Sequence, residues 1–404
     1  MANVSSSNGL EKRPKLRFPG FDEPWKETAL SSVLTERNEY AEKDGTYEHA
    51  TLSKEGIYGK TARYDRDFLV STENKKYKVT HLGDLCYNPA NLKFGVICLN
   101  TYGDAIFSPI YVTFEIEASF DPDFIGAYLT RWDFINRALK YQQGTVYERM
   151  AVSPEDFVSI KCCFPQKAEQ TRLAEFITLL DKRIAAQGKY VESLKKYKRG
   201  VVRTLLSPKH CSIKNVKWTT SRIGDIGIFI KGAPLSKADI SLEGTPFILY
   251  GELYTTYSEV ISNVVRKTQA SVDKQYYSQI GDVIIPTSGE TPEEISTASC
   301  VMLPAIILAG DLNIYRCTQV DGRIMSYILN HVVNDRIARI AQGKSIVHVQ
   351  AAEISKIEIT YPDPFSQKTI IAILAAISDR IDQSNAELRL LNELRKALLQ
   401  KLFI

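Results

Sequence analysis

Several residue groups in this sequence come close to catalytic motifs without completing one. Asn88-Pro89-Ala90-Asn91 resembles the Asn-Pro-Pro-Tyr motif of amino-methyltransferases, but it lacks the second proline and the aromatic residue that would stack on the base. A loop turn explains it better. Gly59-Lys60-Thr61 and Gly343-Lys344-Ser345 look like the end of a Walker A loop, but Lys54 and Ala338 stand where the earlier glycine is needed. We therefore expect no phosphate cradle of that kind.

The sequence also lacks the patterns that nuclease, hydrolase or metal chemistry would require. A charged segment imitates the acid and Glu-x-Lys pattern of restriction-type nucleases with cramped spacing, through Asp65, Asp67, Glu73 and Lys75. No Gly-x-Ser-x-Gly elbow occurs. The seven cysteines form no Cys-x-x-Cys pair, and the five histidines never stand at ligand spacing. The sequence predicts no metal site, no disulfide framework and no catalytic residues.

Three loop regions combine aromatic, polar and cationic side chains in a way that suits contacts with nucleic acid. They cover residues 47–66, residues 229–232 together with 250–257, and residues 287–291. Lys and Arg can bond guanine edges, Glu can accept from the cytosine amino group, and Thr or Tyr can contact bases or phosphates. Loops of this composition are also common on ordinary protein surfaces, so they do not establish DNA binding alone.

A basic stretch gives a second indication of the same kind. Residues 182–209 hold nine Lys and Arg side chains and one acid, Glu192, although the whole chain carries a net charge of only +4. Either this is simply an exposed helix face, or it attracts phosphates or an acidic partner.

The chain repeats one pattern in two halves of about 195 residues. Matches at offsets of 193 to 199 residues are Trp25 with Trp218, Leu30 with Ile223, Gln143-Gly144 with Gln342-Gly343, Pro165 with Pro362, Gln170 with Gln367, and Leu205 with Leu402. Because the offset stays at 197 without gaps over about forty residues before the end, we interpret it as a duplicated unit.

Each half ends in a long stretch with apolar residues in alternating steps of four and three, which predicts a helix with a heptad seam. Polar residues interrupt both seams at matching places, Gln187 with Ser384 and Lys198 with Arg395. Prolines at 165 and 208 bracket the first helix, and those at 362 and 364 precede the second. About 40 residues would span roughly 60 Å. We expect the two helices to pack as an antiparallel coiled coil with pseudo-twofold symmetry.

The segments before the helices look like mixed α+β globules. Residues 95–99, 110–114 and 282–286 are short apolar runs typical of strands, whereas 124–139 and 322–340 have helical periodicity. With 404 residues, 44% of them apolar, the chain is expected to form at least two domains. No apolar run approaches the length of a membrane span, and residues 1–10 do not form a signal peptide, so we expect a cytoplasmic protein.

The duplicated architecture resembles the specificity (S) subunit of type I restriction-modification systems over nearly the whole chain. The resemblance rests on two globules, each followed by a helix with the same heptad pattern. It also rests on short matches, namely Phe18-Pro19-Gly20-Phe21 with Trp25, Gly281-Asp282-Val283-Ile284-Ile285-Pro286, the Gln-Gly loop before each helix, Glu169-Gln170 after Pro165, and the closing Leu398-Leu399-Gln400-Lys401-Leu402-Phe403. The second half departs from it at Ser366-Gln367, where the acid before the glutamine is missing.

This resemblance implies a non-catalytic subunit that reads double-stranded DNA. Each globule would be a target recognition domain for one half of a split, asymmetric site, and the paired helices would separate the two domains and dock two methyltransferase (M) subunits. The partners would methylate adenine with S-adenosylmethionine, or translocate and cut DNA through restriction (R) subunits that use ATP and Mg. The chain itself would bind no cofactor. Two readers on one rod would address half-sites at a fixed spacing.

The resemblance also divides the chain and suggests DNA-binding residues. We expect a disordered tail (1–16), recognition domain 1 (17–165), a central helical spacer (166–206), a linker (207–217), recognition domain 2 (218–362) and a C-terminal helical spacer (363–404). The candidate contacts are Tyr47, Lys54, Tyr58, Lys60, Gly144 and Thr145 in the first half, and Lys231, Tyr250, Glu252, Tyr254, Ser288, Gly343, Lys344 and Ser345 in the second. For the two Gln-Gly loops a tight turn remains the alternative.

Two other functions stay open at this point. The chain could be an adaptor whose coiled coil scaffolds proteins while the globules bind ligands other than DNA. A self-contained restriction enzyme is disfavoured by length and by the incomplete motifs.

Overall fold

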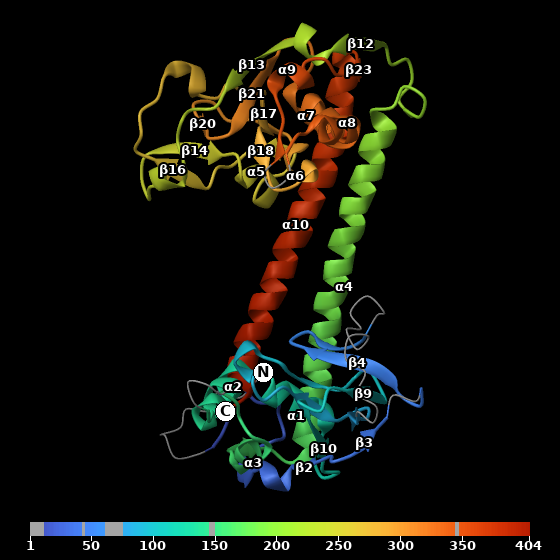
Figure 1. The fold of residues 1–404 in the computed structure, drawn as a ribbon, viewed down its shortest axis with the longest axis vertical. Coiled ribbons are helices and arrows are strands. Elements are labelled where there is room, and N and C mark those ends of the chain that lie inside the picture. Colours follow the sequence, from blue (N-terminus) through green and yellow to red (C-terminus); the bar gives the residue numbers. More distant parts are fainter. Residues whose placement is uncertain (1–11, 43–44, 61–75, 145–149, 344–346) are drawn as a thin grey trace. The chain divides into compact units, whose positions relative to one another are not determined.

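The computed structural model of the chain describes residues 12–42, 45–60, 76–144, 150–343 and 347–404. The chain forms two compact units, unit 1 from residues 1–187 and 388–404, and unit 2 from residues 188–387. Two long helices, α4 (Lys167–Leu205) and α10 (Pro364–Leu402), each contribute one part to unit 1 and the other part to unit 2 (Figure 1). Neither these nor any other helix within the described ranges is long and apolar enough to cross a membrane.

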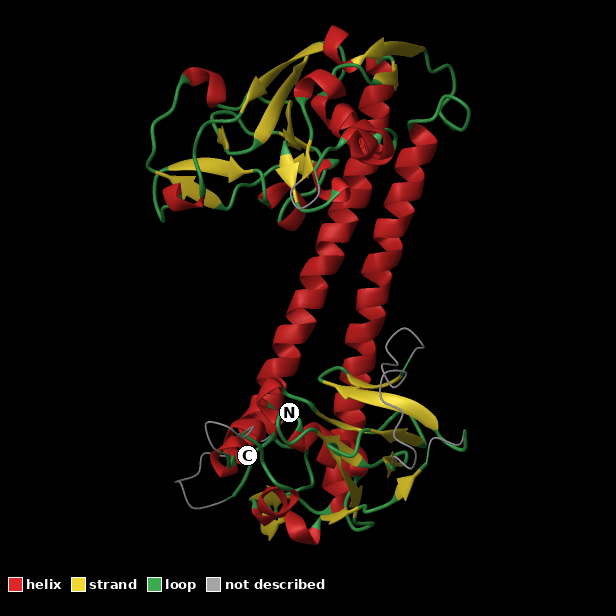
Figure 2. Ribbon diagram, in the orientation of Figure 1, coloured by secondary structure: helices red, strands yellow, loops and turns green. Residues whose placement is uncertain are grey.

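Within the described residues, unit 1 combines antiparallel and mixed sheets with short helices (Figure 2). Its strands are β1 (Lys26–Ala29), β2 (Leu34–Glu36), β3 (Tyr40–Ala41), β4 (Glu48–Ser53), β5 (Gly56–Gly59), β6 (Tyr77–Thr80), β7 (Leu85–Tyr87), β8 (Ile97–Leu99), β9 (Ala105–Phe107), β10 (Val112–Ile116) and β11 (Lys161–Phe164), and its short helices are α1 (Pro122–Leu129), α2 (Trp132–Ala138) and α3 (Pro154–Ser159). The strand orders are β1-β11, β2-β10-β7-β8 and β3-β6-β9-β4-β5. Its main core packs these helices and the second sheet onto the first turns of α4 and the last turns of α10.

Unit 2 follows the same plan with a larger central sheet. Its strands are β12 (Trp218–Arg222), β13 (Gly227–Lys231), β14 (Thr245–Leu249), β15 (Val260–Ile261), β16 (Arg266–Thr268), β17 (Asp282–Pro286), β18 (Ser288–Gly289), β19 (Ser299–Val301), β20 (Ile307–Ala309), β21 (Leu312–Cys317), β22 (Val347–His348) and β23 (Glu358–Pro362), and its short helices are α5 (Glu252–Thr255), α6 (Pro292–Ile295), α7 (Gly322–His331), α8 (Asn334–Ile340) and α9 (Ala351–Ile354). The strand orders are β12-β23, β13-β21-β17-β19-β15, β16-β14-β20 and β18-β22.

The junction between globule and helix is built in the same way in both units. In unit 1 the buried amide of Gln170 accepts from the Asp121 backbone N (2.9 Å) and donates to the Pro165 carbonyl (2.9 Å). In unit 2, Gln367 accepts from the Asp321 backbone N (2.8 Å) and donates to the Pro362 carbonyl (2.8 Å). Each glutamine therefore ties the start of a long helix to the start of a short one, α1 or α7.

The long helices pack against each other antiparallel within each unit. In unit 1, Leu173 and Ile177 of α4 share a core with Leu402 of α10, and the Arg395 guanidinium pairs with Asp181 (Nη2–Oδ2 3.0 Å). In unit 2, Val202 and Leu205 of α4 share a core with Ile370 and Leu374 of α10. Early residues of α4 therefore contact late residues of α10, and late residues of α4 contact early residues of α10. This confirms the predicted antiparallel packing, and the two units confirm the predicted mixed α+β fold.

The details of the predicted helices differ from expectation in two ways. Each of the two globule helices is broken into two, α1 and α2 in unit 1 and α7 and α8 in unit 2. At the first break the Thr130 hydroxyl caps the Gly126 carbonyl (2.8 Å), and at the second lie the β-branched residues Val332 and Val333. Pro364 does not precede α10 but is its first residue, because that position needs no backbone N–H. The predicted domain boundaries stay a prediction.

Candidate nucleic-acid interface

Unit 2 gathers three of the predicted DNA-binding residues where β13 ends and β21 begins. Lys231 is the last residue of β13 and is exposed, and Gly232 donates to the Leu312 carbonyl (2.9 Å). The Tyr250 ring lies over Gly310, since a Cβ added there would stand 3.1 Å from its Cδ1 atom. The Ser288 hydroxyl donates to the Asp311 carboxylate (3.0 Å). Lys231, Tyr250 and Ser288 therefore surround the start of β21.

The second Gln-Gly loop adjoins the same edge. Ser288 in β18 stands opposite His348 in β22, and His348 exchanges two backbone hydrogen bonds with Gln342 (3.0 and 2.8 Å). Gly343 follows with a φ of 134°, a conformation that favours glycine. Lys344 and Ser345 lie outside the described residues. The sequence-predicted loop and Ser288 are thus neighbours, although 55 residues separate Ser288 from Gly343.

Glu252 and Tyr254 in α5 differ in what their side chains can reach. The Glu252 carboxylate is buried, accepts from the Leu249 backbone N (3.2 Å) and pairs with Arg266 (2.9 Å). Tyr254 is half-buried, and its pKa is raised by burial first and then by the neighbouring Tyr250, Glu294 and Glu290. Tyr254 therefore lies among the side chains of the edge described above, whereas the Glu252 carboxylate holds two other elements together.

In unit 1 the predicted residues lie mostly on the hairpin of β4 and β5. Lys54 occupies the turn with an exposed side chain, and Tyr58 is 49% exposed while its hydroxyl donates to the Glu55 carbonyl (3.0 Å). The Lys60 backbone N donates to the His49 carbonyl (2.8 Å) and so extends the hairpin by one residue. Tyr47 lies at the base of β4, where its ring packs partly buried against Tyr77, Val79 and Ile106.

Tyr102 lies beside this hairpin, although no sequence pattern singled it out. A hydrogen bond with Glu48 raises the pKa of Tyr102 to about 12, and burial adds to that shift. The ring is 38% exposed, and its hydroxyl lies beside Gly59, where an added Cβ would come within 2.7 Å. Tyr58 on the hairpin and Tyr102 in the loop before β9 are thus two exposed rings in the same region of unit 1. Only the fold brings residue 102 next to residues 48 and 59, so no local pattern could have found it.

The first Gln-Gly loop lies on a different part of unit 1. Gln143 and Ala151 exchange two backbone hydrogen bonds (2.9 Å each), and Gly144 has a φ of 155°. A Cβ at Gly144 would approach the Met150 Cα to 2.9 Å, so this tight approach requires glycine. Thr145 lies outside the described residues.

The Asn88-Pro89-Ala90-Asn91 segment is a hydrogen-bonded turn, as expected. The Asn88 side-chain oxygen accepts from the backbone N of Ala90 (3.1 Å) and of Asn91 (3.2 Å), and the Pro89 carbonyl accepts from the Val152 backbone N (3.3 Å). In unit 2 the Thr287 carbonyl accepts from Val349 in the same manner (3.0 Å). Both units therefore place the Gln-Gly loop beside the segment that follows a central strand, β7 or β17.

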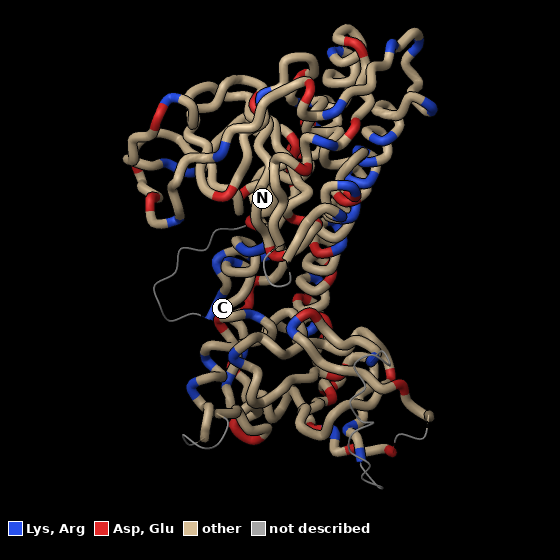
Figure 3. The backbone as a smooth tube through the Cα atoms, turned by 45° about the horizontal axis from the view of Figure 1, so that its top comes forward, with Lys and Arg blue, Asp and Glu red and all other residues tan. Residues whose placement is uncertain are grey.

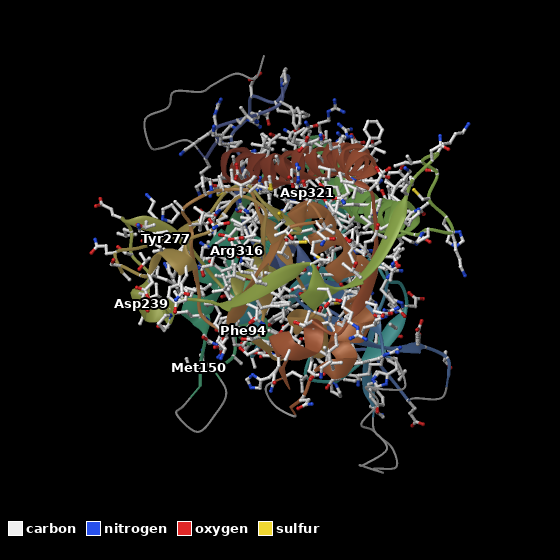
Figure 4. All side chains as sticks on the ribbon, turned by 90° about the horizontal axis from the view of Figure 1, so that it is seen from above. Phe94, Met150, Asp239, Tyr277, Arg316 and Asp321 are labelled. Atoms are coloured by element: carbon white, nitrogen blue, oxygen red, sulfur yellow. The ribbon has the colours of Figure 1, made fainter. Side chains whose placement is uncertain are left out.

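A buried aspartate lies at the start of each of these two strands, and only Asp282 was recognised from the sequence. Asp84 precedes β7 and pairs with Arg37 (2.9 and 3.1 Å), and Asp282 opens β17 and pairs with Arg316 (3.1 Å). Arg316 also donates to the Tyr277 carbonyl (2.9 Å; Figure 4). Gly83-Asp84 repeats Gly281-Asp282 at an offset of 198, and this is the signal that sequence reasoning missed.

Two remaining predictions can be placed only in part. The nuclease-like Asp65, Asp67, Glu73 and Lys75 all lie outside the described residues. Among the described residues, no group of three or more His, Cys, Asp or Glu side chains could hold a metal ion.

Residues 182–205 of the basic stretch form the second half of α4, along which Lys and Arg recur (Figure 3), and residues 206–209 follow the helix. One of its cations is not available to DNA. Lys198 is 8% exposed and pairs with Glu259 (2.8 Å), which also binds the His331 ring (2.7 Å). Burial pushes the pKa of Glu259 upward, but the His331 hydrogen bond and the Lys198 charge outweigh it and hold this pKa at about 2. Lys198, one of the predicted seam interruptions, therefore anchors α4 to the globule of unit 2.

Comparison with known proteins assigns this architecture. Residues 215–393 match the family model described as the type I restriction modification DNA specificity domain. No curated protein sequence matches the chain. Among solved structures, the S subunit of the type I restriction-modification system of M. genitalium has 16% identity and a TM-score of 0.59, over 97% of this chain and 99% of its own. A chain solved in work on complex assembly and conformational transition of the type I R-M system has the same identity and TM-score, over 95% of this chain and 98% of its own.

The sequence match covers residues 215–393, less than half of the chain, and shows that this segment is similar to the type I restriction modification DNA specificity domain. At 16% identity the two structures show a shared fold over nearly the full length of the chain. Together they confirm the predicted resemblance of this chain to specificity subunits of type I restriction-modification systems.

Proposed function

We propose that this chain recognises a split, asymmetric double-stranded DNA site and directs adenine methylation or restriction by partner subunits. The observation that carries the proposal is the repeated junction of Gln170 and Gln367, which attaches two different globules to one pair of helices. Because residues 215–393 match a DNA specificity domain, the equivalent construction of unit 1 supports a second reader there.

The two readers are proposed to address different bases. The scaffold strands β1-β11 and β12-β23 correspond, and so does the central order β2-β10-β7-β8 with β13-β21-β17-β19. Unit 2 adds β15 to this sheet, and it has a sheet β16-β14-β20 where unit 1 has β3-β6-β9-β4-β5. A common frame with different reading elements is what an asymmetric site requires. The DNA contacts would centre on Lys231, Tyr250, Tyr254 and Ser288 in unit 2, and on Lys54, Tyr58, Lys60 and Tyr102 in unit 1.

In this proposal the partners supply all the chemistry. Two methyltransferase subunits would use S-adenosylmethionine, restriction subunits would join through them and use ATP and Mg, and the chain itself would only position them on DNA. The work would take place in the cytoplasm, where the host DNA lies. The division into recognition domains 17–165 and 218–362 with their spacers belongs to this proposal as well.

Methylation mapping of host DNA tests the function. We expect a split adenine motif to vanish when the gene is deleted, and only one half of that motif to change when residues 218–362 are exchanged for another recognition domain. An unchanged methylome in the presence of an active methyltransferase would contradict the proposal and favour the adaptor.

Binding to a panel of DNA duplexes tests the candidate contacts. Lys231→Ala is expected to weaken binding to the site of unit 2 and to relax the base preference there by about 1–3 kcal/mol if Lys231 contacts a base edge. The exposed Lys237→Ala in the same unit serves as the control and should leave base preference unchanged. Equal loss on all sequences would assign Lys231 to phosphate contact instead.

A further inference from the structure

The two units carry different side chains at matching edges of their central sheets. In unit 2, Asp311 comes directly before β21 and is exposed, and its carboxylate accepts from the Ser288 hydroxyl (3.0 Å). Its backbone is held as well, because the Asp311 carbonyl accepts from the Thr287 backbone N (2.8 Å). Asp311 therefore presents a carboxylate that is held in place at the edge where Lys231 and Tyr250 also lie.

The equivalent edge in unit 1 follows from strand register. Strands β7 and β17 align at an offset of 198, which places Tyr87 with Ile285. Tyr87 stands opposite Val112 in β10, and Ile285 stands opposite Asn313 in β21. Val112 and Asn313 are therefore equivalent, and β10 aligns with β21 at an offset of 201.

The Ser288–Asp311 pair of unit 2 is replaced by two apolar residues in unit 1. At the offset of 201 Ile110 stands in the place of Asp311, and at the offset of 198 Ala90 stands in the place of Ser288. The Ile110 side chain is 60% exposed. Unit 2 thus has a hydroxyl that holds a carboxylate, whereas unit 1 has a methyl group and an exposed aliphatic side chain at the same two positions. Both members of the pair change together, so the two edges differ in their chemistry and not in one residue alone.

Asn313 is a further polar residue at the edge of unit 2. It stands opposite Lys231 in β13 and is 3% exposed, whereas unit 1 has the buried Val112 in its place. Among the residues that the structure describes, its Nδ2 atom has no hydrogen-bond partner. A buried amide N–H without an acceptor is unfavourable unless a ligand or a water molecule supplies one. The edge of unit 2 is therefore more polar than its own packing requires.

An exposed carboxylate is informative at a DNA-binding edge because phosphates repel it. In the major groove, cytosine presents the amino donor N4, which a carboxylate can accept. Guanine and thymine present acceptors there, and the amino group of adenine lies next to the acceptor N7. A carboxylate therefore favours cytosine and disfavours the other bases by repulsion. An aliphatic side chain instead suits the methyl group of thymine.

We propose that residue 311 in unit 2 and residue 110 in unit 1 are equivalent base-discriminating positions. Asp311 accepts from the amino group of a cytosine, and Ile110 contacts the methyl group of a thymine. Ser288 is a positioning residue, because its hydroxyl orients the Asp311 carboxylate. The proposal rests on the function proposed above, which supplies the split DNA site.

The first test is binding of the full chain, together with its methyltransferase subunits, to duplexes that carry each base in turn within the mapped motif. The wild-type motif is expected to contain a cytosine in the half that changes when residues 218–362 are exchanged, and a thymine in the other half. Asp311→Asn keeps the shape of the side chain, but its amide can pair with adenine. We expect the preference for cytosine at one position to fall by about 5- to 150-fold, with adenine admitted there.

An exposed acid in the same unit supplies the matched control. Asp225 precedes β13, at the end of that strand opposite to Lys231. Asp225→Asn removes the same charge as Asp311→Asn and should leave the base preference of both half-sites unchanged.

A reciprocal exchange tests whether the two positions are equivalent. The double variant S288A/D311I gives unit 2 the residue types of unit 1, and A90S/I110D does the opposite. The first is expected to move the preference at one position from cytosine toward thymine, and the second from thymine toward cytosine, each by about 3- to 10-fold and only in its own half-site. Deoxyuridine, which lacks the methyl group of thymine, should weaken binding of the wild type but not of Ile110→Ala.

Unchanged base preferences in Asp311→Asn and in both exchange variants would overturn the proposal while leaving the proposed function intact. An equal loss of affinity for all four bases would also overturn it, since Asp311 would then support the fold and not the readout. The same holds if the wild type prefers a base other than cytosine at the position that Asp311→Asn changes. If the wild type gives no split motif although the methyltransferase is active, the proposed function itself fails.

Discussion

Unit 1 and unit 2 join globule and long helix through equivalent glutamines, Gln170 and Gln367. They differ in the contacts that hold the segment before the first strand of each globule. In unit 1, Arg17 reaches the buried Glu169 with two hydrogen bonds (2.8 and 2.7 Å), and Phe18 packs beside it. In unit 2, Ser366 stands in place of Glu169 at the offset of 197, and His210 in place of Arg17 at the offset of 193. The acid missing from the second half is thus absent together with the cation that it would bind.

The two units also differ in how they secure the polar seam positions. Arg395 in unit 1 pairs with Asp181 on the other long helix, and both side chains remain partly exposed. Lys198 in unit 2 pairs with Glu259 of the globule and is nearly buried. The same heptad position therefore joins helix to helix in one unit and helix to globule in the other. A duplicated scaffold has kept its hydrogen-bonded junctions while its ion pairs diverged.

The largest expected effect breaks the buried pair of unit 2. Glu259→Ala leaves Lys198 charged and without its partner in a nearly closed site, and we expect a loss of about 3–5 kcal/mol in the free energy of unfolding of unit 2. Asp181→Ala removes the equivalent, more exposed pair of unit 1 and should cost about 1 kcal/mol or less. Chemical denaturation of the full chain measures both. Equal losses would show that burial does not distinguish the two seam positions.

Glu259 also predicts that the stability of unit 2 depends on pH in the acid range. The pKa of Glu259 is about 2 in the folded chain against 4.5 for the free side chain. Its ionised form therefore contributes stability that is fully present above pH 4.5 and is lost as the pH falls toward 2, about 3 kcal/mol in all. Comparison of the wild type with Glu259→Gln between pH 5 and 2 measures this part. A variant with an unchanged slope against pH would contradict the assignment.

A third change replaces the Arg17–Glu169 pair of unit 1 with the residue types at the equivalent positions of unit 2. Glu169→Ser leaves the Arg17 guanidinium, whose side chain is 11% exposed, without its carboxylate, and about 2–3 kcal/mol of stability should be lost. Adding Arg17→His gives both positions the residue types of unit 2 and should restore part of the loss, because the unpaired guanidinium is removed. The thermal midpoints of the single and double variants measure it, and no recovery in the double variant would mean that the two positions are not coupled.

The sequence predicted the parts of this fold that are repeated and failed where contacts are not local. The correspondence of Gln170 with Gln367 and the two antiparallel helices followed from spacing alone, because heptads and a constant offset are properties of the chain. The breaks at Thr130 and at Val332 were missed, since apolar periodicity continues across them.

The regions of the candidate site were predictable from the sequence, but the roles of its individual side chains were not. Lys231, Tyr250 and Ser288 belong to three separate loops, and the fold places them around the start of β21. Glu252 has the residue type for a base contact, yet its carboxylate is taken up by Leu249 and Arg266, which no spacing reveals. Tyr102 became visible only because β4, β5 and the loop before β9 meet in space.

The smallest effect tests the equivalence of the junctions. Gln170→Ala and Gln367→Ala each remove two hydrogen bonds of a buried amide and leave the Asp121 or Asp321 backbone N–H without its acceptor. Because the donors, acceptors and burial match, we expect losses of about 1–3 kcal/mol that agree between the two variants. Hydrogen exchange at Asp121 and Asp321 localises each effect to its own unit. If one variant lost much more stability than the other, the two junctions would share their geometry but contribute unequally to the free energy of unfolding.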